Sequence, residues 1–241
     1  MRTARMASIV CSTTLVLAGV AGLTACAGGS GAKSNAGTEA RALADESVAL
    51  MRDVDDFKLT GSGEMDGTTM SLNFCVRKGT DAKGTITIDG ATVEVVVIGK
   101  DQYMKADAKA WAKLVDVAGG RGSADAVEKL DGKYMKVDAG GDDGFGSMAD
   151  PFEGDTEGVT KGDPVTVEGV RVIPLTQEFE GDTTTVYVRA TGKPYPVVVK
   201  TEGSSPSSMR YTKAKARCEP VAPPADLVVD MSEGTRPDVE V

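Results

Sequence analysis

The side chains that could do chemistry in this chain are its cysteines, because its 241 residues include no histidine. Without histidine there can be no histidine-based catalytic triad, no imidazole general base and no histidine-ligated zinc or copper. The four cysteines are Cys11, Cys26, Cys75 and Cys218. Their sequence contexts differ, and those contexts decide which chemistry is open to each of them.

Cys26 follows an apolar segment that is typical of an exported protein. Arg2 and Arg5 precede residues 6–23, which are mostly Ala, Val, Leu, Ile and small polar residues. This run is too short and too rich in small residues for a stable membrane-spanning helix, so it predicts a signal peptide. Residues 23–26, Leu-Thr-Ala-Cys, resemble a bacterial lipobox. The resemblance implies that Cys26 receives a diacylglycerol on its sulfur and that the preceding residues, Cys11 included, are removed. The alternative is a plain cleavage site beside a chance cysteine.

Cys75 and Cys218 remain as an even pair in a chain that we expect to reach an oxidising compartment. We therefore predict a structural disulfide between them. It would close a loop of more than 100 residues, and its chain-entropy stabilisation would approach about 4–5 kcal/mol. Two unpaired thiols are the alternative, and no neighbouring residue supports a reactive thiol or a metal site.

Other polar clusters lack the spacing that catalysis or metal binding needs. The acidic loop at residues 138–143 has neither the alternating oxygen ligands nor the twelfth-position Glu of an EF-hand. Asp55 and Asp56 do not make a glycosidase carboxylate pair, and the serines of residues 204–208 are typical of a turn. We therefore predict a non-enzyme with no catalytic residue, no metal and no cofactor. A carboxylate-based hydrolase is the least favoured alternative.

The net charge of the chain argues against some classes of binding partner. The chain carries a net charge of −9, and removal of residues 1–25 with Arg2 and Arg5 would lower it to −11. An acidic surface argues against nucleic acid, which needs a basic footprint, and against electrostatic adhesion to anionic lipid. We expect attachment through the acyl chains on Cys26, since two chains are enough for stable anchoring. The expected location is the extracytoplasmic face of the cell membrane.

Composition divides the chain into four parts. Residues 1–25 are the signal peptide, and residues 26–38 are the lipidated cysteine with a flexible tether of Gly, Ser and Ala. Residues 39–218 are expected to form the folded domain. Residues 219–241 form a proline-rich tail, predicted to be an extended strap with a short apolar piece at residues 227–229.

Periodicity predicts one helix followed by many strands. Apolar residues at helical spacing predict a helix that starts at Thr38 and ends near Val54. Period-two alternation then predicts strands joined by short turns, two of which carry the Asp-Gly dipeptide of a tight hairpin. The expected strands cover residues 58–65, 68–76, 85–88, 91–98, 102–105, 133–137, 165–180, 183–190, 195–201 and 209–218. Short helical patterns at residues 107–114 and 124–130 interrupt them, and residues 138–162 are expected to be mostly irregular.

Alternation also separates the two faces of the predicted sheet. One face is apolar and rich in β-branched residues, and a sheet of seven or more strands must curl to cover it. Because the available helices are few and short, the curved sheet could enclose an apolar cavity that accepts a lipid. In the alternative, large side chains fill that space. The side chains expected to line the cavity are Leu72, Phe74, Ile86, Ile88, Val93, Val95, Val97, Met104, Val186 and Val188.

The order of these elements resembles the LppX/LprG-like lipoproteins of actinobacteria, which have a LolA-like fold. The resemblance rests on the lipobox, the tether, the first helix and several short motifs. These motifs are Gly-Thr-Ile-Thr-Ile-Asp-Gly at residues 84–90, Val-Glu-Val-Val-Val-Ile-Gly at 93–99, Gln-Tyr-Met-Lys at 102–105, Ala110-Trp111, and Tyr-Val-Arg-Ala-Thr-Gly-Lys-Pro-Tyr-Pro at 187–196.

The resemblance implies an α+β fold in which a half-barrel of mostly antiparallel strands wraps around a few helices. It also implies a cavity that binds acylated lipids or lipoglycans for transfer across the cell envelope. It brings no catalytic residue to this chain, and the proline-rich tail and the Cys75/Cys218 pair have no counterpart in it. The sequence thus predicts a membrane-anchored lipoprotein that binds or carries an apolar ligand. The alternative function is a non-catalytic envelope scaffold with a filled core.

Overall fold

The structure is a computed structural model that describes most of the expected folded domain. The described residues are 32–65, 67–78, 80–117, 130–138, 150–152, 156–179 and 181–231. Cys11, Cys26 and the predicted signal peptide lie outside them, as do most of the acidic loop at residues 138–143 and the helical pattern at residues 124–129.

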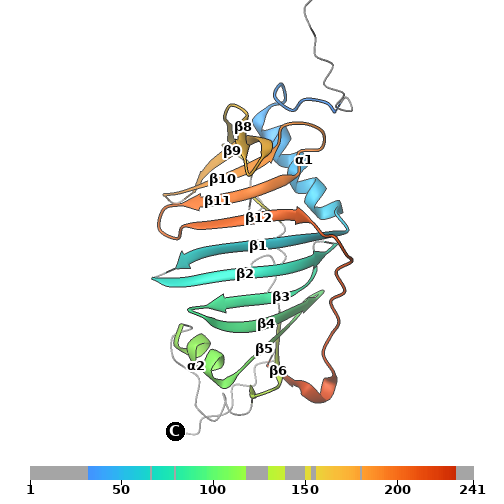
Figure 1. The fold of residues 1–241 in the computed structure, drawn as a ribbon, viewed down its shortest axis with the longest axis vertical. Helices are drawn as coiled ribbons and strands as arrows, with labels where there is room; N and C mark the ends of the chain where they lie inside the picture. The colour runs from blue at the N-terminus through green and yellow to red at the C-terminus, as the bar shows by residue number, and fades with distance from the viewer. Residues whose placement is uncertain are drawn as a thin grey trace, which may run out of the picture. The chain divides into compact units, whose positions relative to one another are not determined.

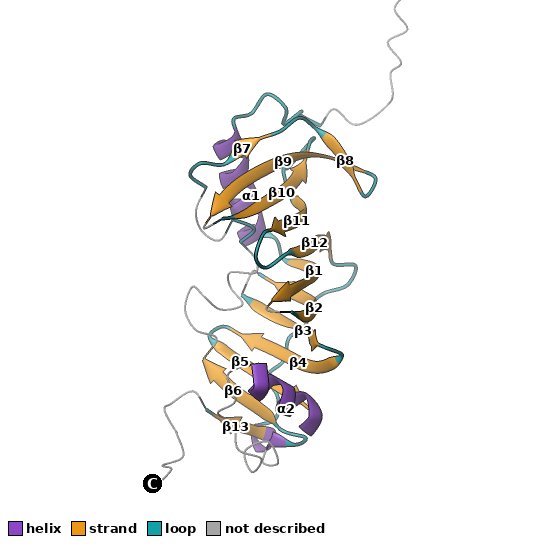
Figure 2. Cartoon of the chain, turned by 90° about the vertical axis from the view of Figure 1, so that its left-hand side faces the viewer, coloured by secondary structure: helices purple, strands orange, loops and turns teal. Residues whose placement is uncertain are grey.

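A single curved and open sheet dominates the fold, and its strands are antiparallel except for one parallel pair (Figures 1 and 2). The order of strands across the sheet is β13-β6-β5-β4-β3-β2-β1-β12-β11-β10-β9-β7, and β8 pairs with β9 outside this path. Two series of consecutive strands therefore lie side by side, and they are joined where β1 pairs with β12. This arrangement confirms the predicted α+β class with a curved, mostly antiparallel sheet.

The first series forms one half of the sheet. It comprises β1 (Asp56–Met65), β2 (Thr68–Arg77), β3 (Asp81–Ile88), β4 (Ala91–Ile98), β5 (Asp101–Ala106) and β6 (Tyr134–Asp138). Tight turns connect most of these strands. Asp89 and Gly90 both have positive φ, at 46° and 79°, as the predicted Asp-Gly hairpin requires.

The second series forms the other half, and two α-helices accompany the sheet in the described part of the chain. Its strands are β7 (Thr160–Lys161), β8 (Val165–Val167), β9 (Val170–Phe179), β10 (Asp182–Arg189), β11 (Pro196–Glu202) and β12 (Ser207–Lys213). The last strand, β13 (Val228–Asp230), lies beside β6 at the far end of the first half. The helices are α1 (Ala40–Asp53) and α2 (Ala108–Val117), and a short 3-10 turn (Ala225–Leu227) precedes β13.

Two predicted strands end differently in the structure. The run at residues 165–180 is a hairpin rather than one strand, because Glu168 and Gly169 adopt φ of 51° and 79° between β8 and β9. The strand expected at residues 209–218 ends at Lys213, and Cys218 lies beyond it. In both cases the strand ends where the apolar residues change from odd to even positions, after Val167 in the first run and after Tyr211 in the second.

The first helix begins at Ala40 rather than at Thr38, and Glu39 takes the N-cap position without a side-chain hydrogen bond. Its end at Asp53 agrees with the prediction. Asp107 does cap α2, because its Oδ1 accepts a hydrogen bond of 2.7 Å from the backbone N–H of Ala110.

The last part of the expected tether is docked on the fold rather than free. Asn35 is 4% exposed, and its Nδ2 donates hydrogen bonds to the backbone oxygens of Arg189 and Gly192 at 2.8 and 3.0 Å. Ser34 forms a β-bridge with Thr191. A buried side chain with both amide hydrogens bonded fixes these residues against the turn between β10 and β11.

The two faces of the sheet differ as the alternation predicted. We call the face that carries the main core the inner face. Across it, Leu72 pairs with Ile86 and Ile86 with Val93, which places one apolar row over three strands. Gly84 lies in the same face. A Cβ at Gly84 would meet the backbone oxygen of Asn73 at 2.1 Å and the Phe74 ring at 2.7 Å, so only glycine fits beneath that ring.

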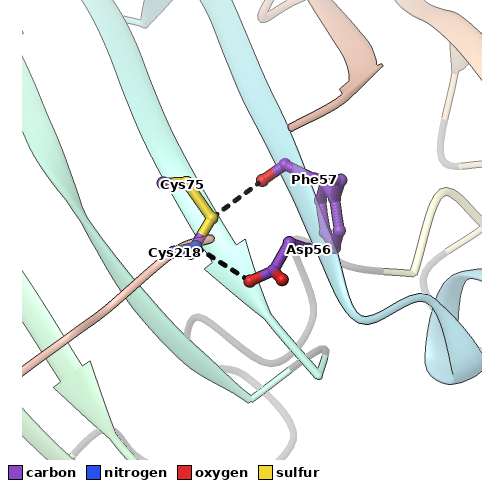
Figure 3. The surroundings of a disulfide bond; sticks show 4 residues. All are labelled: Asp56, Phe57, Cys75 and Cys218. Carbon is purple, nitrogen blue, oxygen red and sulfur yellow. Dashed lines mark hydrogen bonds between the residues drawn. A yellow bond between two sulfur atoms is a disulfide. The ribbon is translucent and has the colours of Figure 1, made fainter. Parts of the chain in front are cut away.

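The segment after β12, residues 214–231, is an extended strap that runs past the first series of strands to the far end of the sheet (Figure 1). A disulfide joins Cys218 in the strap to Cys75 in β2, with 5.5 Å between the Cα atoms. The N–H of Cys218 also donates a 2.9 Å hydrogen bond to Oδ1 of Asp56 in β1 (Figure 3). The strap is therefore fixed near its start by one covalent and one polar contact.

The far end of the strap becomes β13, which pairs in parallel with β6. Lys136 in β6 forms ion pairs with Asp101 at 3.1 Å and with Asp230 at 3.4 Å. The hydrogen bond to the Asp101 carboxylate, followed by that to Asp230, raises the pKa of Lys136 above its ordinary value. Nearby, burial and then the Asp101 charge raise the pKa of Tyr103. The strap is thus held by charge as well as by backbone pairing.

Candidate functional site

The ten side chains predicted to line a cavity share the inner face. Six of them are buried in one continuous core, namely Phe74, Val93, Val95, Val97, Val186 and Val188. Three more, Leu72, Ile86 and Met104, are half-buried and pack against that core. Ile88 is buried as well but lies outside the cluster. The structure therefore brings the predicted lining together as packed core.

Two helices cover this core from the inner side. α1 contributes Leu43, Ala44 and Met51, and α2 contributes Ala110 and Trp111, all nearly inaccessible to water. α2 packs against β4 and β5, whereas α1 contacts β7 at the other end of the sheet. Within the described ranges, these two helices are the only α-helices that cover the inner face.

Each covering helix also buries a polar atom that has no hydrogen-bond partner among the residues that the structure describes. These atoms are Oγ of Ser47 in α1 and Nε1 of Trp111 in α2. Ser47 is 0% exposed and Trp111 is 3% exposed.

A cavity of about 750 Å³ lies at a different place, where the C-terminal end of α1 and the start of the strap meet the ends of β1, β11 and β12. We call it the strap groove. None of the ten predicted lining residues belongs to it. It is lined by Met51, Asp53, Val54, Asp55, Asp56, Phe57, Glu168, Val170, Arg189, Tyr195, Pro196, Val197, Arg210, Tyr211, Thr212, Lys213, Ala214, Lys215, Ala216 and Arg217.

The floor of the strap groove belongs to the core of the fold. Met51, Phe57 and Tyr211 are members of the same buried cluster that holds the inner-face valines. The rings of Phe57 and Tyr211 stack with centroids 6.0 Å apart. An apolar surface is therefore continuous between the groove and the inner face.

The rim of the strap groove is rich in cations although the chain as a whole is acidic. Five basic side chains line it, against the four carboxylates of Asp53, Asp55, Asp56 and Glu168. Arg210 is paired with Glu168, and Asp56 accepts the Cys218 N–H. Within the described ranges no ion pair involves the other four basic side chains, Arg189, Lys213, Lys215 and Arg217.

Sequence reasoning missed this groove, although a signal for it was present. Residues 210–217, Arg-Tyr-Thr-Lys-Ala-Lys-Ala-Arg, contain four basic and no acidic residues in a chain of net charge −9. The rest of the site could not be inferred from the sequence. Arg189, Tyr195 and α1 meet this run only because β12 pairs with β1 and β11.

No metal site or membrane span emerges from the described residues. They contain no group of three or more His, Cys, Asp or Glu side chains that could hold a metal ion. They also contain no helix that is both long and apolar enough to cross a bilayer.

Comparison with known proteins identifies structures with a similar fold. No family model and no curated protein matches the sequence. The crystal structure of LprF from Mycobacterium bovis matches with a TM-score of 0.51 and 12% identity, over 76% of this chain and 96% of that chain. The MucA/MucB complex of Pseudomonas aeruginosa matches with a TM-score of 0.39 and 14% identity, over 72% of this chain and 56% of that chain. The likeness to LprF confirms the LolA-like fold that the resemblance to LppX/LprG-like lipoproteins implied.

Proposed function

We propose, on the premise of the fold shared with LprF, that this chain is a lipid-anchored extracytoplasmic protein that binds a lipid or another apolar ligand against the inner face of its sheet. The observation that carries the proposal is the inner face itself. It presents an apolar row from β9 to β6, and only two short helices cover it within the described part of the chain.

The mechanism we propose is sequestration of acyl chains. An acyl chain that leaves water for an apolar surface gains about 0.8 kcal/mol per buried CH₂. The half-buried side chains Leu72, Ile86 and Met104 would contact the ligand first, since they are the accessible part of the predicted lining.

The absence of histidine from the sequence supports a binding function rather than catalysis. The fold supports the same proposal, since ligand sites are concave and lined mostly by apolar side chains and the inner face of this curved sheet is apolar. The partners that we propose are the membrane, through the acyl chains on Cys26, and an acylated ligand on the inner face.

The ligand is tested by mass spectrometry on the Cys26→Ser protein purified from its native host. We expect a co-purifying lipid. Ile86→Gln places an amide in the inner face and should reduce the amount of bound lipid severalfold, whereas Thr85→Gln on the opposite face of the same strand should not. Protein that carries no lipid in any of these forms would contradict the proposal.

One observation favours a second candidate function. Six of the ten predicted lining side chains are packed in a continuous core, as expected of an envelope scaffold with a filled interior. If the Cys26→Ser protein is free of lipid and pulls down an envelope protein through its outer face, the scaffold function replaces ligand binding.

A further inference from the structure

We propose that the strap groove is a binding site for the anionic headgroup of an amphiphile, and that the apolar part of the same molecule lies on the floor formed by Met51, Phe57 and Tyr211. This inference rests on the proposed function, because it assigns a chemical class to the apolar ligand. It also names a site that lies outside the predicted lining.

The charges of the groove lining are the first observation that favours an anionic ligand. Four cations line the groove without an ion-pair partner in the described residues, against the three carboxylates of Asp53, Asp55 and Asp56, so the lining keeps a net positive charge in an acidic chain. A concentration of unpaired cations in a hollow focuses the local field and attracts anions. Two of these cations are arginines, whose planar guanidinium groups suit phosphate and carboxylate.

The apolar floor of the strap groove favours a ligand with an apolar part as well as a charge. A purely ionic site would not need a stacked aromatic pair at its base, yet Phe57 and Tyr211 lie there with Tyr195, Pro196 and Val197 beside them. Because three floor residues belong to the core beneath the inner face, an alkyl or aryl group can bury itself there while its headgroup stays at the rim. The volume of about 750 Å³ suits a ligand of this kind.

The strap supplies one wall of the groove. Ala214, Lys215, Ala216 and Arg217 belong to the strap and end directly at Cys218. The disulfide to Cys75 and the hydrogen bond to Asp56 fix that wall (Figure 3). Two of these four cations, Lys215 and Arg217, are therefore held in place by the strap rather than by the sheet.

The test compares three amphiphiles of equal chain length by isothermal titration below their critical micelle concentrations. They are dodecyl phosphate, dodecyl maltoside and dodecyltrimethylammonium, each titrated into the Cys26→Ser protein. We expect dodecyl phosphate to bind at least tenfold more tightly than the other two, and its affinity to fall as salt is added.

A double variant with a matched control tests the site. Lys213→Gln with Arg217→Gln should weaken dodecyl phosphate about tenfold and leave dodecyl maltoside unchanged. Lys109→Gln with Lys133→Gln removes the same charge from exposed positions away from the groove and should change neither affinity. Circular dichroism and the melting temperature check that each variant is folded.

The outcomes separate the two proposals. Equal affinity for all three amphiphiles, or equal effects of the two double variants, overturns the anionic site and leaves apolar binding intact. No binding of any amphiphile overturns the proposed function as well. Vesicles of phosphatidylglycerol distinguish the source of the headgroup: binding that depends on Lys213 and Arg217 indicates a lipid within a membrane, and binding of dodecyl phosphate alone indicates a free amphiphile.

Discussion

At the residue scale, Cys75 and Cys218 connect the stability of the fold to the geometry of the strap groove. The bond links residues that are 143 positions apart and buries Cys218 to 2% exposure. It also holds the strap at the point where Arg217 reaches the groove. A single covalent contact therefore supports both the sheet and the wall of the proposed site.

Cys75→Ser should lower the free energy of unfolding by about 4–5 kcal/mol under oxidising conditions, because the denatured chain regains the freedom of a very long loop. Urea unfolding followed by circular dichroism measures the change. With a reductant present, wild type and variant should unfold at the same urea concentration. A variant as stable as the oxidised wild type would show that the bond contributes nothing.

Gly84→Ala should destabilise the protein by about 1–3 kcal/mol, since a Cβ there would overlap the Asn73 backbone and the Phe74 ring. Gly90 differs from Gly84 in the origin of its constraint. A Cβ at Gly90 would meet no atom within 4 Å, so an alanine there would be disfavoured by the positive φ of +79° and not by overlap. In the Gly84→Ala background, Phe74→Leu removes the ring and should recover only the part of the lost stability that comes from overlap with that ring. Thermal unfolding of wild type and of the single and double variants decides between ring and backbone overlap.

At the element scale, the strap joins the middle of the sheet to its far end. It leaves β12 and passes the disulfide. Its end, β13, lies beside β6 (Figure 2). Charge fixes that last contact, since Lys136 lies between Asp101 and Asp230.

The docking of β13 should weaken at high pH. A raised pKa in the folded state means that the stabilisation by Lys136 is complete below its ordinary value of 10.5 and is lost as the pH rises through the folded-state value. Burial also raises the pKa values of Tyr103 and Tyr134. Their contributions to the free energy of unfolding are therefore lost as the pH rises, like that of Lys136. Melting temperatures of wild type and Lys136→Gln should therefore differ at pH 8 and converge above pH 10.5. A constant difference would contradict the role of the lysine charge.

Asp107→Ala should lower stability by about 1 kcal/mol, because it removes the oxygen that accepts the Ala110 N–H at the start of α2. Asp107→Asn keeps a capping oxygen and should retain most of that stability. Denaturant unfolding of both variants is the measurement, and equal losses would indicate that the charge matters more than the cap.

The elements also show where sequence reasoning succeeds and where it stops. The β4 strand and the Asp89-Gly90 turn were predictable, because a period of two and a dipeptide with positive φ are local properties. The β8–β9 turn at Glu168 was missed although it leaves a local signal, since the apolar residues change from odd to even positions across Glu168 and Gly169. The docking of Asn35 depends on carbonyls more than 150 positions away, and no local pattern carries that information.

The strap groove shows the same limit for the site. Its basic run at residues 210–217 is visible in the sequence, but its opposite wall comes from α1 and from the start of β11. The pairing of β12 with β1 brings these parts together. The inner face was predictable because each strand reveals its own apolar side, whereas a cavity between distant elements needs the topology.

At the scale of the whole molecule, an open sheet must protect its edges from other chains. At one end, β13 covers β6; at the other, the two-residue strand β7 limits the exposed edge of β9. The strap thus has a protective role at the edge in addition to its role at the groove.

A chain that stops after Cys218 keeps the disulfide but lacks β13, so the edge of β6 should become available for pairing. We expect this truncated protein to form larger species in size-exclusion chromatography and in light scattering. A chain that stops after Met231 retains β13 and should stay in the wild-type state. Identical behaviour of the two truncated proteins would show that β13 does not protect the sheet.

The proposed anchor is tested at this scale too. Wild-type protein should partition into detergent and carry the mass of a diacylglycerol on its first residue, Cys26. Cys26→Ser should move it to the aqueous phase. Unmodified Cys26 in membranes of the native host would contradict the anchor while leaving the ligand proposal open to its own test.

The docking of Asn35 has a consequence for any ligand taken from the membrane. Six residues separate Cys26 from Lys33, and a fully extended chain spans about 3.3–3.6 Å per residue, so an acylated Cys26 would lie within about 25 Å of the folded domain. Confinement on such a short tether corresponds to an effective concentration in the millimolar range. A ligand held with only about 4 kcal/mol would then already be half-bound. Loading would need little intrinsic affinity, and the same weakness would allow the ligand to be released.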